Sequence, residues 1–312
     1  MMNTTLNDLL THPEITDLCI NGTDSVFIDR GNGLEPVSAD APLFESDEVM
    51  RSWVLEQISL AGKTWDARYP FIDAALPSGH RLHVAFPPLA RQGILVSLRR
   101  LPNSKIGPAR PTGAVRWKNS ALFEPLRQAV VAGDSILISG ATGSGKTTLA
   151  NDLLEAVPIH ERILALEDTS ELAPRHPHFV SLISRPPNAD GFGEVSVRVL
   201  MKQALRMRPD RIILGECRGA EVLDLLQALN TGHRGSMATL HANTPRDALR
   251  RIELLCLLAS EGTIPTNAIR ELLSIGVQWI AQVRRSTAGR EITELWKIEG
   301  REGDTILMRP YS

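Results

Sequence analysis

The sequence has little of what marks exported, membrane-spanning or disulfide-stabilised proteins. Its 312 residues include only three cysteines, Cys19, Cys217 and Cys256, which lie far apart and form no C-x-x-C pair. That spacing argues against a disulfide framework or a zinc cage. No run approaches 18 consecutive apolar residues, and the acidic, polar N-terminal stretch has no apolar segment of the kind found in signal peptides. We therefore expect a protein of the reducing cytoplasm that neither spans a membrane nor is exported.

Strong net charge and aromatic side chains are also scarce. The formal net charge is -2 at pH 7, and aromatic residues make up 4% of the chain. Such a chain has no general attraction to nucleic acid or anionic lipid, and few side chains could stack on bases. No specific nucleic-acid partner is expected. A hydrophobic content of 43% over 312 residues predicts instead a globular protein of two domains.

Short apolar segments broken by turn residues predict a small α/β domain over residues 1–101. One helix is expected near residues 46–61, with Ser46 as its N-cap and Asp47 and Glu48 in the first turn, where carboxylates suit the positive end of the helix dipole. The expected strands are residues 16–20, 25–30, 71–76, 81–86 and 94–100.

A basic segment rich in proline and glycine follows, and we predict that residues 102–118 are an inter-domain linker. Its positive charges favour a solvated hinge, and a hinge that faces phosphate is the alternative. Beyond it, apolar runs at residues 135–140, 162–168, 211–216 and 236–243 alternate with helical stretches. This alternation predicts βα units around a parallel sheet that is buried on both faces. The tail, with turn residues 301–304, predicts a closing hairpin.

A phosphate-binding motif lies where the first of these apolar runs ends. The segment GATGSGKTT, residues 140–148, matches G-x-x-x-x-G-K-[ST] between a strand and a helix, which is the context the motif requires. Residues 119–312 are therefore predicted to be a RecA-like P-loop NTPase domain that binds ATP and Mg²⁺. Lys146 would reach the β- and γ-phosphates, and the Thr147 hydroxyl would bind Mg²⁺. The predicted nucleotide-binding residues are Gly140, Ala141, Thr142, Gly143, Ser144, Gly145, Lys146, Thr147 and Thr148.

Glu216 ends the apolar run at residues 211–216, the position at which doubly wound sheets bind ligands. We predict that Glu216 is the general base that orients and deprotonates the attacking water, and that it meets Mg²⁺ through water. The aspartate that usually precedes this carboxylate is Gly215 here. Water or other groups are therefore expected to complete the metal shell.

At these residues the chain resembles the ATPases of the type II/type IV secretion superfamily, known as traffic ATPases. Residues 185–197 and the tail look most like the tight-adherence (Tad/CpaF-type) pilus assembly branch, and conjugative type IV secretion ATPases come second. The four segments that carry the resemblance are GATGSGKTT (140–148), LALEDTSEL (164–172), LRMRPDRIILGECRG (205–219) and TGHRGSMATLHANTP (231–245).

The resemblance also implies roles for individual residues. Glu167 and Asp168 would lie near the γ-phosphate and metal and assist Glu216, and His241 would sense the γ-phosphate. From the residues alone, the two carboxylates could instead cap a helix and the histidine could be a structural hydrogen bonder. Arginines are expected to neutralise transition-state charge. The candidates are Arg81, Arg99, Arg68, Arg206 and Arg218.

As a whole, the resemblance implies a homohexameric motor that powers pilus assembly or protein secretion across the bacterial envelope. ATP would be held between the N-terminal domain and the ATPase domain. Inner-membrane platform proteins would hold the cytoplasmic ring at the membrane. Two other classes stay open from the residues: a nucleic-acid-translocating P-loop motor and a nucleotide-dependent adaptor that does not hydrolyse ATP.

Overall fold

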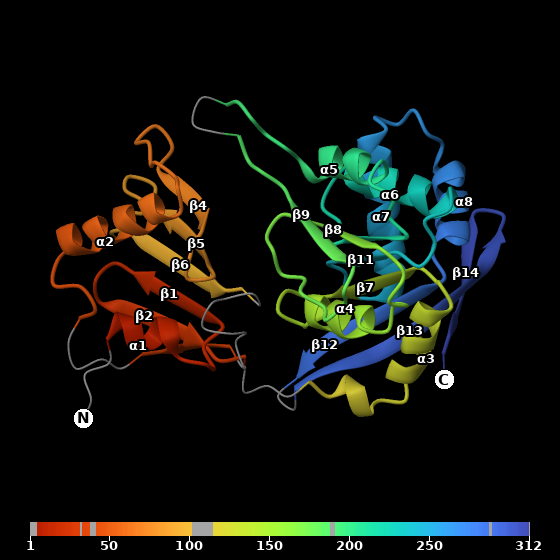
Figure 1. The fold of residues 1–312 in the computed structure, drawn as a ribbon, viewed down its shortest axis with the longest axis horizontal. Coiled ribbons are helices and arrows are strands. Elements are labelled where there is room, and N and C mark those ends of the chain that lie inside the picture. The colour runs from red at the N-terminus through yellow and green to blue at the C-terminus, as the bar shows by residue number, and fades with distance from the viewer. Residues whose placement is uncertain are drawn as a thin grey trace. The chain divides into compact units, whose positions relative to one another are not determined.

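A computed structural model describes residues 5–31, 33–37, 42–101, 115–187, 191–286 and 289–311 (Figure 1). The chain divides into two units, Met1–Ala114 and Val115–Ser312. Most of the predicted linker, residues 102–114, lies outside the described residues, whereas residues 115–118 belong to the second unit. In the described parts of the chain, no helix is long and apolar enough to cross a bilayer.

The N-terminal unit is a six-stranded antiparallel sheet in the order β3-β2-β1-β6-β5-β4, with two helices on one face. Because alternate side chains of a strand face the same side, Leu18, Leu82 and Leu98 join Leu9 and Val54 of the helices in one apolar cluster. The elements are α1 (Leu6–Thr11), β1 (Asp17–Asn21), β2 (Ser25–Asp29), β3 (Leu34–Pro36), α2 (Asp47–Leu60), β4 (Phe71–Ala75), β5 (His80–Ala85) and β6 (Leu95–Arg100).

The helix predicted in this unit is confirmed. The Ser46 hydroxyl accepts a hydrogen bond from the Val49 amide at 3.3 Å, and the first turn of α2 is acidic. Met50, Val54 and Ile58 follow one another at one-turn spacing and are buried, so they form the apolar stripe of an amphipathic helix. Two short elements, α1 and β3, were not predicted. They are six and three residues long, and segments this short show no clear periodicity.

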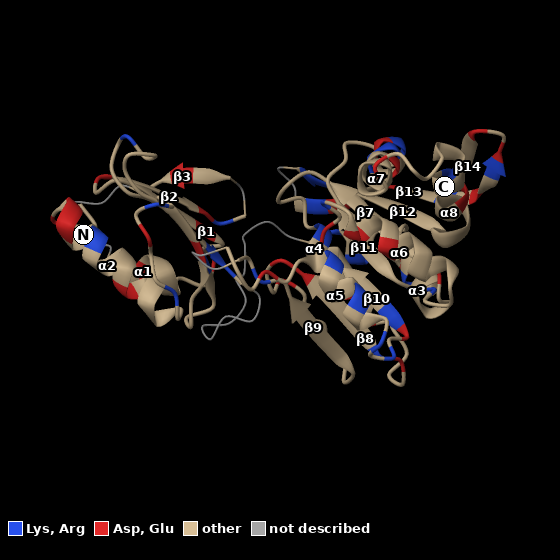
Figure 2. Cartoon of the chain, turned by 90° about the horizontal axis from the view of Figure 1, so that it is seen from above, with Lys and Arg blue, Asp and Glu red and all other residues tan. Residues whose placement is uncertain are grey.

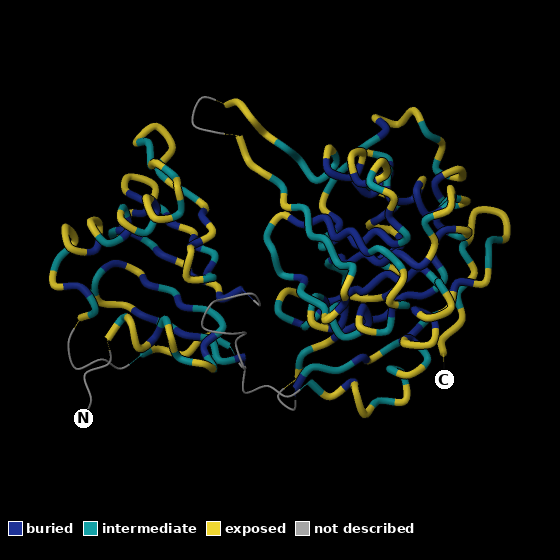
Figure 3. Tube along the Cα trace, viewed as in Figure 1, coloured by how far each residue is buried: buried dark blue, intermediate teal, exposed yellow. Residues whose placement is uncertain are grey.

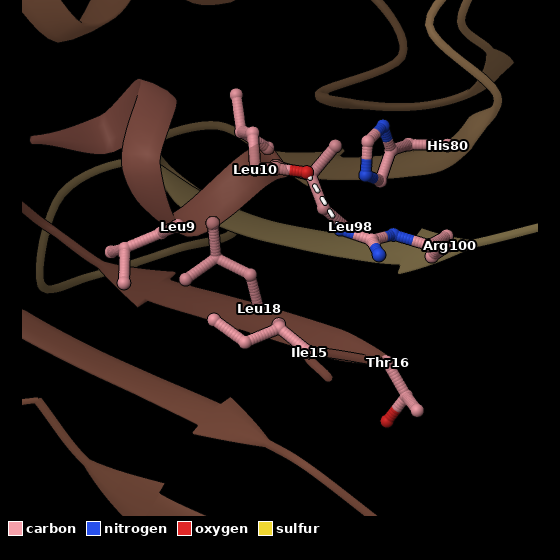
Figure 4. A pocket seen from close by; sticks show the side chains of 8 residues that line it. All are labelled: Leu9, Leu10, Ile15, Thr16, Leu18, His80, Leu98 and Arg100. Carbon is pink, nitrogen blue, oxygen red and sulfur yellow. Dashed lines mark hydrogen bonds between the residues drawn. The ribbon is translucent and has the colours of Figure 1, made fainter. Parts of the chain in front are cut away.

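A buried arginine at the end of β6, Arg100, holds the C-terminal end of α1 (Figure 4). Arg100 is 6% exposed, and its Nη2 donates to the carbonyls of Leu10 and His12 at 2.9 and 2.7 Å. These carbonyls lie at the C-terminal end of α1, which is the negative end of the helix dipole. Burial and the charge of Arg100 lower the pKa of the neighbouring His80 to about 4. The cavity that Figure 4 shows is about 10 Å³, which is far too small for a nucleotide.

The C-terminal unit is an eight-stranded mixed sheet in the order β14-β13-β12-β7-β11-β10-β8-β9. Neighbours are parallel from β12 to β9, and β12–β13 and β13–β14 are antiparallel. The strands are β7 (Ile136–Gly140), β8 (Ile163–Glu167), β9 (Phe179–Ile183), β10 (Arg211–Leu214), β11 (Met237–Leu240), β12 (Trp279–Ser286), β13 (Gly289–Glu302) and β14 (Thr305–Pro310). The helices are η1 (Trp117–Asn119), α3 (Phe123–Val131), α4 (Lys146–Leu154), α5 (Val197–Ala204), α6 (Glu221–Asn230), α7 (Pro245–Ala259) and α8 (Thr266–Gly276).

The central strands of this sheet are buried on both faces (Figure 3). Leu137 and Leu164 pack with α5, α6, α7 and α8 on one face, and Ile136 and Ile163 pack with α3 and α4 on the other. Strands covered on both sides must be apolar throughout, as β7, β8, β10 and β11 are. The predicted α/β class is therefore confirmed. Because these strands are parallel and adjacent, the loops that follow them gather at one edge of the sheet.

Candidate active site

The phosphate loop, residues 141–145, joins β7 to α4 at that edge. Gly143 and Gly145 have φ angles of 71° and 100°, and residues other than glycine rarely adopt positive φ angles. At Gly140 a Cβ would lie 2.4 Å from the Val283 carbonyl oxygen, so no other residue fits without a shift. The glycines of the motif are thus required by the shape of the loop and by the neighbouring strand β12.

Lys146 connects this loop to His241, the residue that follows β11, and β11 is the neighbour of β7 in the sheet. Its ammonium donates to the carbonyls of Gly140 and Ala141 at 3.0 and 2.9 Å, and Nδ1 of His241 lies 3.4 Å away. An ammonium has no acceptor, so Nδ1 accepts and the imidazole proton is on Nε2. That nitrogen lies 2.9 Å from Oε1 of Glu216. Lysine, histidine and carboxylate therefore lie in series, within polar contact distance of one another.

Glu216 is held from its other side by Arg218, which pairs with its Oε2. Burial by itself raises the pKa of Glu216, but the hydrogen bond and charge of Arg218, together with His241 and Lys146, outweigh burial and leave the pKa below its usual value. Burial and the charge of Lys146 also lower the pKa of His241. At neutral pH the site therefore contains an anionic Glu216 and a neutral His241.

Asp168 takes part in the same network from the end of β8. Its Oδ2 lies 3.1 Å from Nη1 of Arg218, and its Oδ1 accepts a hydrogen bond from the Ser184 hydroxyl at 2.8 Å. Arg218 therefore bridges Asp168 and Glu216. The structure brings together four of the residues expected to act at the γ-phosphate: Glu216, Asp168, His241 and Arg218.

Glu167 was predicted to lie near the γ-phosphate and the metal, but both of its carboxylate oxygens accept hydrogen bonds from the protein itself. It is buried, its Oε1 accepts from the amides of Glu171 and Leu172 at 2.8 Å each, and its Oε2 accepts from the Ser181 hydroxyl at 2.9 Å. Burial raises the pKa of Glu167. Both oxygens thus close the loop after β8, and this loop is not helical, so Glu167 does not cap a helix either. A Cβ on Gly215 would lie 3.0 Å from Cγ of Glu167, so the missing aspartate leaves room for this glutamate.

Glu171 is the residue that this loop brings to the phosphate site, and the sequence analysis did not single it out. The Thr147 hydroxyl donates to Oε2 of Glu171 at 3.1 Å. The only sequence signal was its place within residues 164–172. Among the described residues no three His, Cys, Asp or Glu side chains gather as a metal cage. Mg²⁺ usually keeps several water and phosphate ligands. Thr147, and a carboxylate acting through water, are the groups that would hold it.

The other candidate arginines lie elsewhere. Arg206 is exposed and precedes β10, whereas the network above follows the C-terminal ends of the strands, so Arg206 lies at the opposite edge of the sheet. In the N-terminal unit, Arg81 pairs in register with Arg99, and both alternate with the buried residues of β5 and β6. They therefore lie on the face of that sheet that the helices leave open. Arg68 is exposed and pairs with Asp66. Roles for these arginines at the nucleotide stay predictions.

Known proteins resemble this chain over nearly its full length. The model of the type II/IV secretion system protein family matches residues 3–285. A putative conjugal transfer protein of Mycobacterium tuberculosis is 41% identical over 308 residues, covering 95% of this chain and 85% of that protein. The type IV secretion system protein PtlH of Bordetella pertussis is 30% identical, covering 95% of this chain and 94% of PtlH.

A solved structure agrees with these sequences. The VirB11 ATPase from the Brucella suis type IV secretion system is 28% identical and aligns with a TM-score of 0.50, over 94% of this chain and 92% of that one. The chain therefore belongs to the type II/IV secretion system protein family, and it is an ATPase of that family.

Proposed function

We propose that this chain is the ATP-hydrolysing motor of a bacterial type IV secretion or conjugal-transfer machine. The observation that carries the proposal is the series of polar contacts from Lys146 through His241 to Glu216 at the sheet edge, in a chain whose relatives at 41% and 30% identity are conjugal-transfer and type IV secretion proteins. The tight-adherence pilus reading rests on residues 185–197 and the tail alone, and these named relatives favour the conjugative alternative instead.

In the proposed reaction, ATP displaces Lys146 from the carbonyls of Gly140 and Ala141, and the ammonium then holds the β- and γ-phosphates. Arg218 turns from Glu216 toward the γ-phosphate. Loss of this paired charge raises the pKa of Glu216 and makes its carboxylate a stronger base for the attacking water. ATP binding would thus turn Glu216 into the stronger base that the hydrolysis of ATP requires.

His241 and the loop after β8 complete the proposed site. The neutral imidazole keeps its Nε2 proton directed at Glu216, so that the carboxylate stays oriented toward the water. Mg²⁺, when bound with ATP, neutralises charge on the β- and γ-phosphates. Thr147 would hold the ion, and Glu171 would accept the hydrogen bond of a metal-bound water.

We further propose the assembly that the family resemblance implies. Six copies would form a ring, ATP would be held between the N-terminal domain and the ATPase domain, and Arg81 and Arg99 would be the first arginines to neutralise transition-state charge. Partner proteins at the inner membrane would convert domain movement into transport.

The proposal is tested by deleting the gene in its source bacterium and measuring plasmid transfer, effector secretion and surface pili side by side. Complementation with the wild-type chain should restore transfer or secretion, and complementation with Lys146→Ala should not. If pili disappear while transfer and secretion are unchanged, the pilus reading replaces this one.

A nucleic-acid motor is the rival of another class. Figure 2 shows basic and acidic segments interspersed in both units, and the formal net charge of -2 gives no general attraction to nucleic acid. Salt-sensitive DNA binding by the purified chain, with ATP hydrolysis stimulated by DNA, would support the rival.

A further inference from the structure

Side chains from two distant segments support the phosphate loop. Arg290, on β13, donates from Nε to the Gly143 carbonyl at 3.3 Å. Its Cδ and the Trp117 ring lie so close to Gly145 that a Cβ there would come within 2.8 and 3.1 Å of them. Gly143 and Gly145, the two glycines of the phosphate loop, are thus both in contact with this support.

The same support joins the loop to the point at which the chain enters the ATPase unit. The Arg116 amide donates to the Arg290 carbonyl at 2.9 Å, and Val115 forms a parallel β-bridge with Arg290. Trp117 is fully buried, and its indole Nε1 donates to Asp152 of α4 at 2.8 Å. Residues 115–117, Arg290, the phosphate loop and its helix are therefore linked by direct contacts.

The hydrogen bond to Gly143 has a consequence for the phosphate side of the loop. In a trans peptide the carbonyl and the following N–H point in opposite directions. Because Arg290 holds the Gly143 carbonyl, the Ser144 N–H is directed the other way, where it donates to the Ala141 carbonyl at 3.3 Å. Lys146 donates to the same carbonyl at 2.9 Å. The Ser144 N–H therefore faces the side of the loop on which the motif lysine lies.

We propose that Arg290 is a positioning residue of the phosphate loop. It fixes the Gly143–Ser144 peptide so that the Ser144 N–H is preset for phosphate, and it transmits the position of residues 115–117 to the loop. Arg290 acts through the loop backbone. A preset amide contributes equally to bound ATP, the transition state and bound ADP, so its effect belongs to binding rather than to turnover.

The test compares Arg290→Met and Arg290→Lys in the full chain, with Arg309→Met as the matched control. Arg309 belongs to the same C-terminal hairpin, is 69% exposed and pairs with Glu299. Arg290→Met should raise the Kd for ADP, measured by calorimetry, and the KM for ATP together, by about tenfold, with kcat within about twofold. The lysine variant should recover part of this loss, and Arg309→Met should match the wild type.

Two outcomes would overturn the proposal. One is unchanged Kd and KM in Arg290→Met. The other is a fall in kcat with Kd and KM unchanged, which would make Arg290 a group that acts at the transition state. If Arg290→Met does not fold, Arg290→Lys decides alone, since a lysine lacks the Nε donor and should still raise Kd and KM severalfold. Thermal unfolding of each variant shows whether a general loss of stability accounts for the change.

Discussion

Glu216 and Glu167 are carboxylates from neighbouring strands, and their contacts predict opposite results for the same substitution. Glu216 accepts from Arg218 and lies 2.9 Å from His241 at the sheet edge, whereas Glu167 is buried and accepts from backbone amides. Glu216→Gln should lower kcat by at least about a hundredfold and keep the Kd for ADP. Glu167→Gln keeps an acceptor for the amides and should lose less than about tenfold in kcat.

Steady-state hydrolysis and calorimetry on the two variants check this expectation. If Glu167→Gln is as inactive as Glu216→Gln, Glu167 takes part in the chemistry, as the family resemblance implied. Thermal unfolding separates that outcome from a loss of the loop, because a glutamine that no longer closes the loop would also lower the Tm.

Arg218 sets the protonation of Glu216, and this gives a prediction about pH. Its hydrogen bond and charge hold the pKa of Glu216 below the usual value despite burial. Arg218→Met should therefore raise that pKa, and the acidic limb of kcat/KM against pH should move to higher pH by about one unit. Arg198→Met is the matched control, because Arg198 pairs with Asp224 on α6. An acidic limb that stays in place would show that Glu216 does not control this titration.

At the scale of elements, α1 depends on the end of β6. Arg100 holds the last carbonyls of α1, and its charge, together with burial, lowers the pKa of His80 to about 4. A depressed histidine pKa means that the unfolded chain binds a proton that the folded chain resists. The stability of this unit should therefore fall as pH drops from about 6.5 to 4, by up to about 3 kcal/mol.

Urea unfolding at several pH values, followed by circular dichroism, measures this slope. His80→Gln should remove most of it, whereas the exposed His160 changed to Gln should leave it as in the wild type. A slope that His80→Gln does not alter would assign the acid sensitivity to other groups.

At the scale of the whole molecule, assembly is the property that the proposed motor adds to a single chain. If groups from more than one copy complete the ATP-binding site, Mg²⁺-dependent hydrolysis per chain should rise with protein concentration as the ring forms. Lys146→Ala should stay at background at every concentration. Light scattering on the same samples gives the molar mass. A monomer with constant specific activity would contradict the proposed ring. It would not contradict the assignment of the chain as an ATPase.

Much of the fold and part of the candidate site could be predicted from local sequence. The phosphate loop, the helix that begins after Ser46 and the apolar strands each depend on residues close together in the chain, because turn geometry, capping and strand periodicity are local properties. Glu216 could be placed for the same reason, since it follows an apolar run directly. The short elements α1 and β3 could not, because their positions depend on packing against the sheet.

The sequence by itself therefore determined the family, the α/β class and the phosphate loop. Tertiary structure decided which side chains meet there. Strand order brings His241 to Lys146 across 95 residues and Arg290 to Gly143 across 147, and it puts Arg206 at the far edge. It also selected Glu171, rather than Glu167, as the neighbour of Thr147. Contacts between distant segments follow from the order and direction of strands in the sheet, which no local pattern contains.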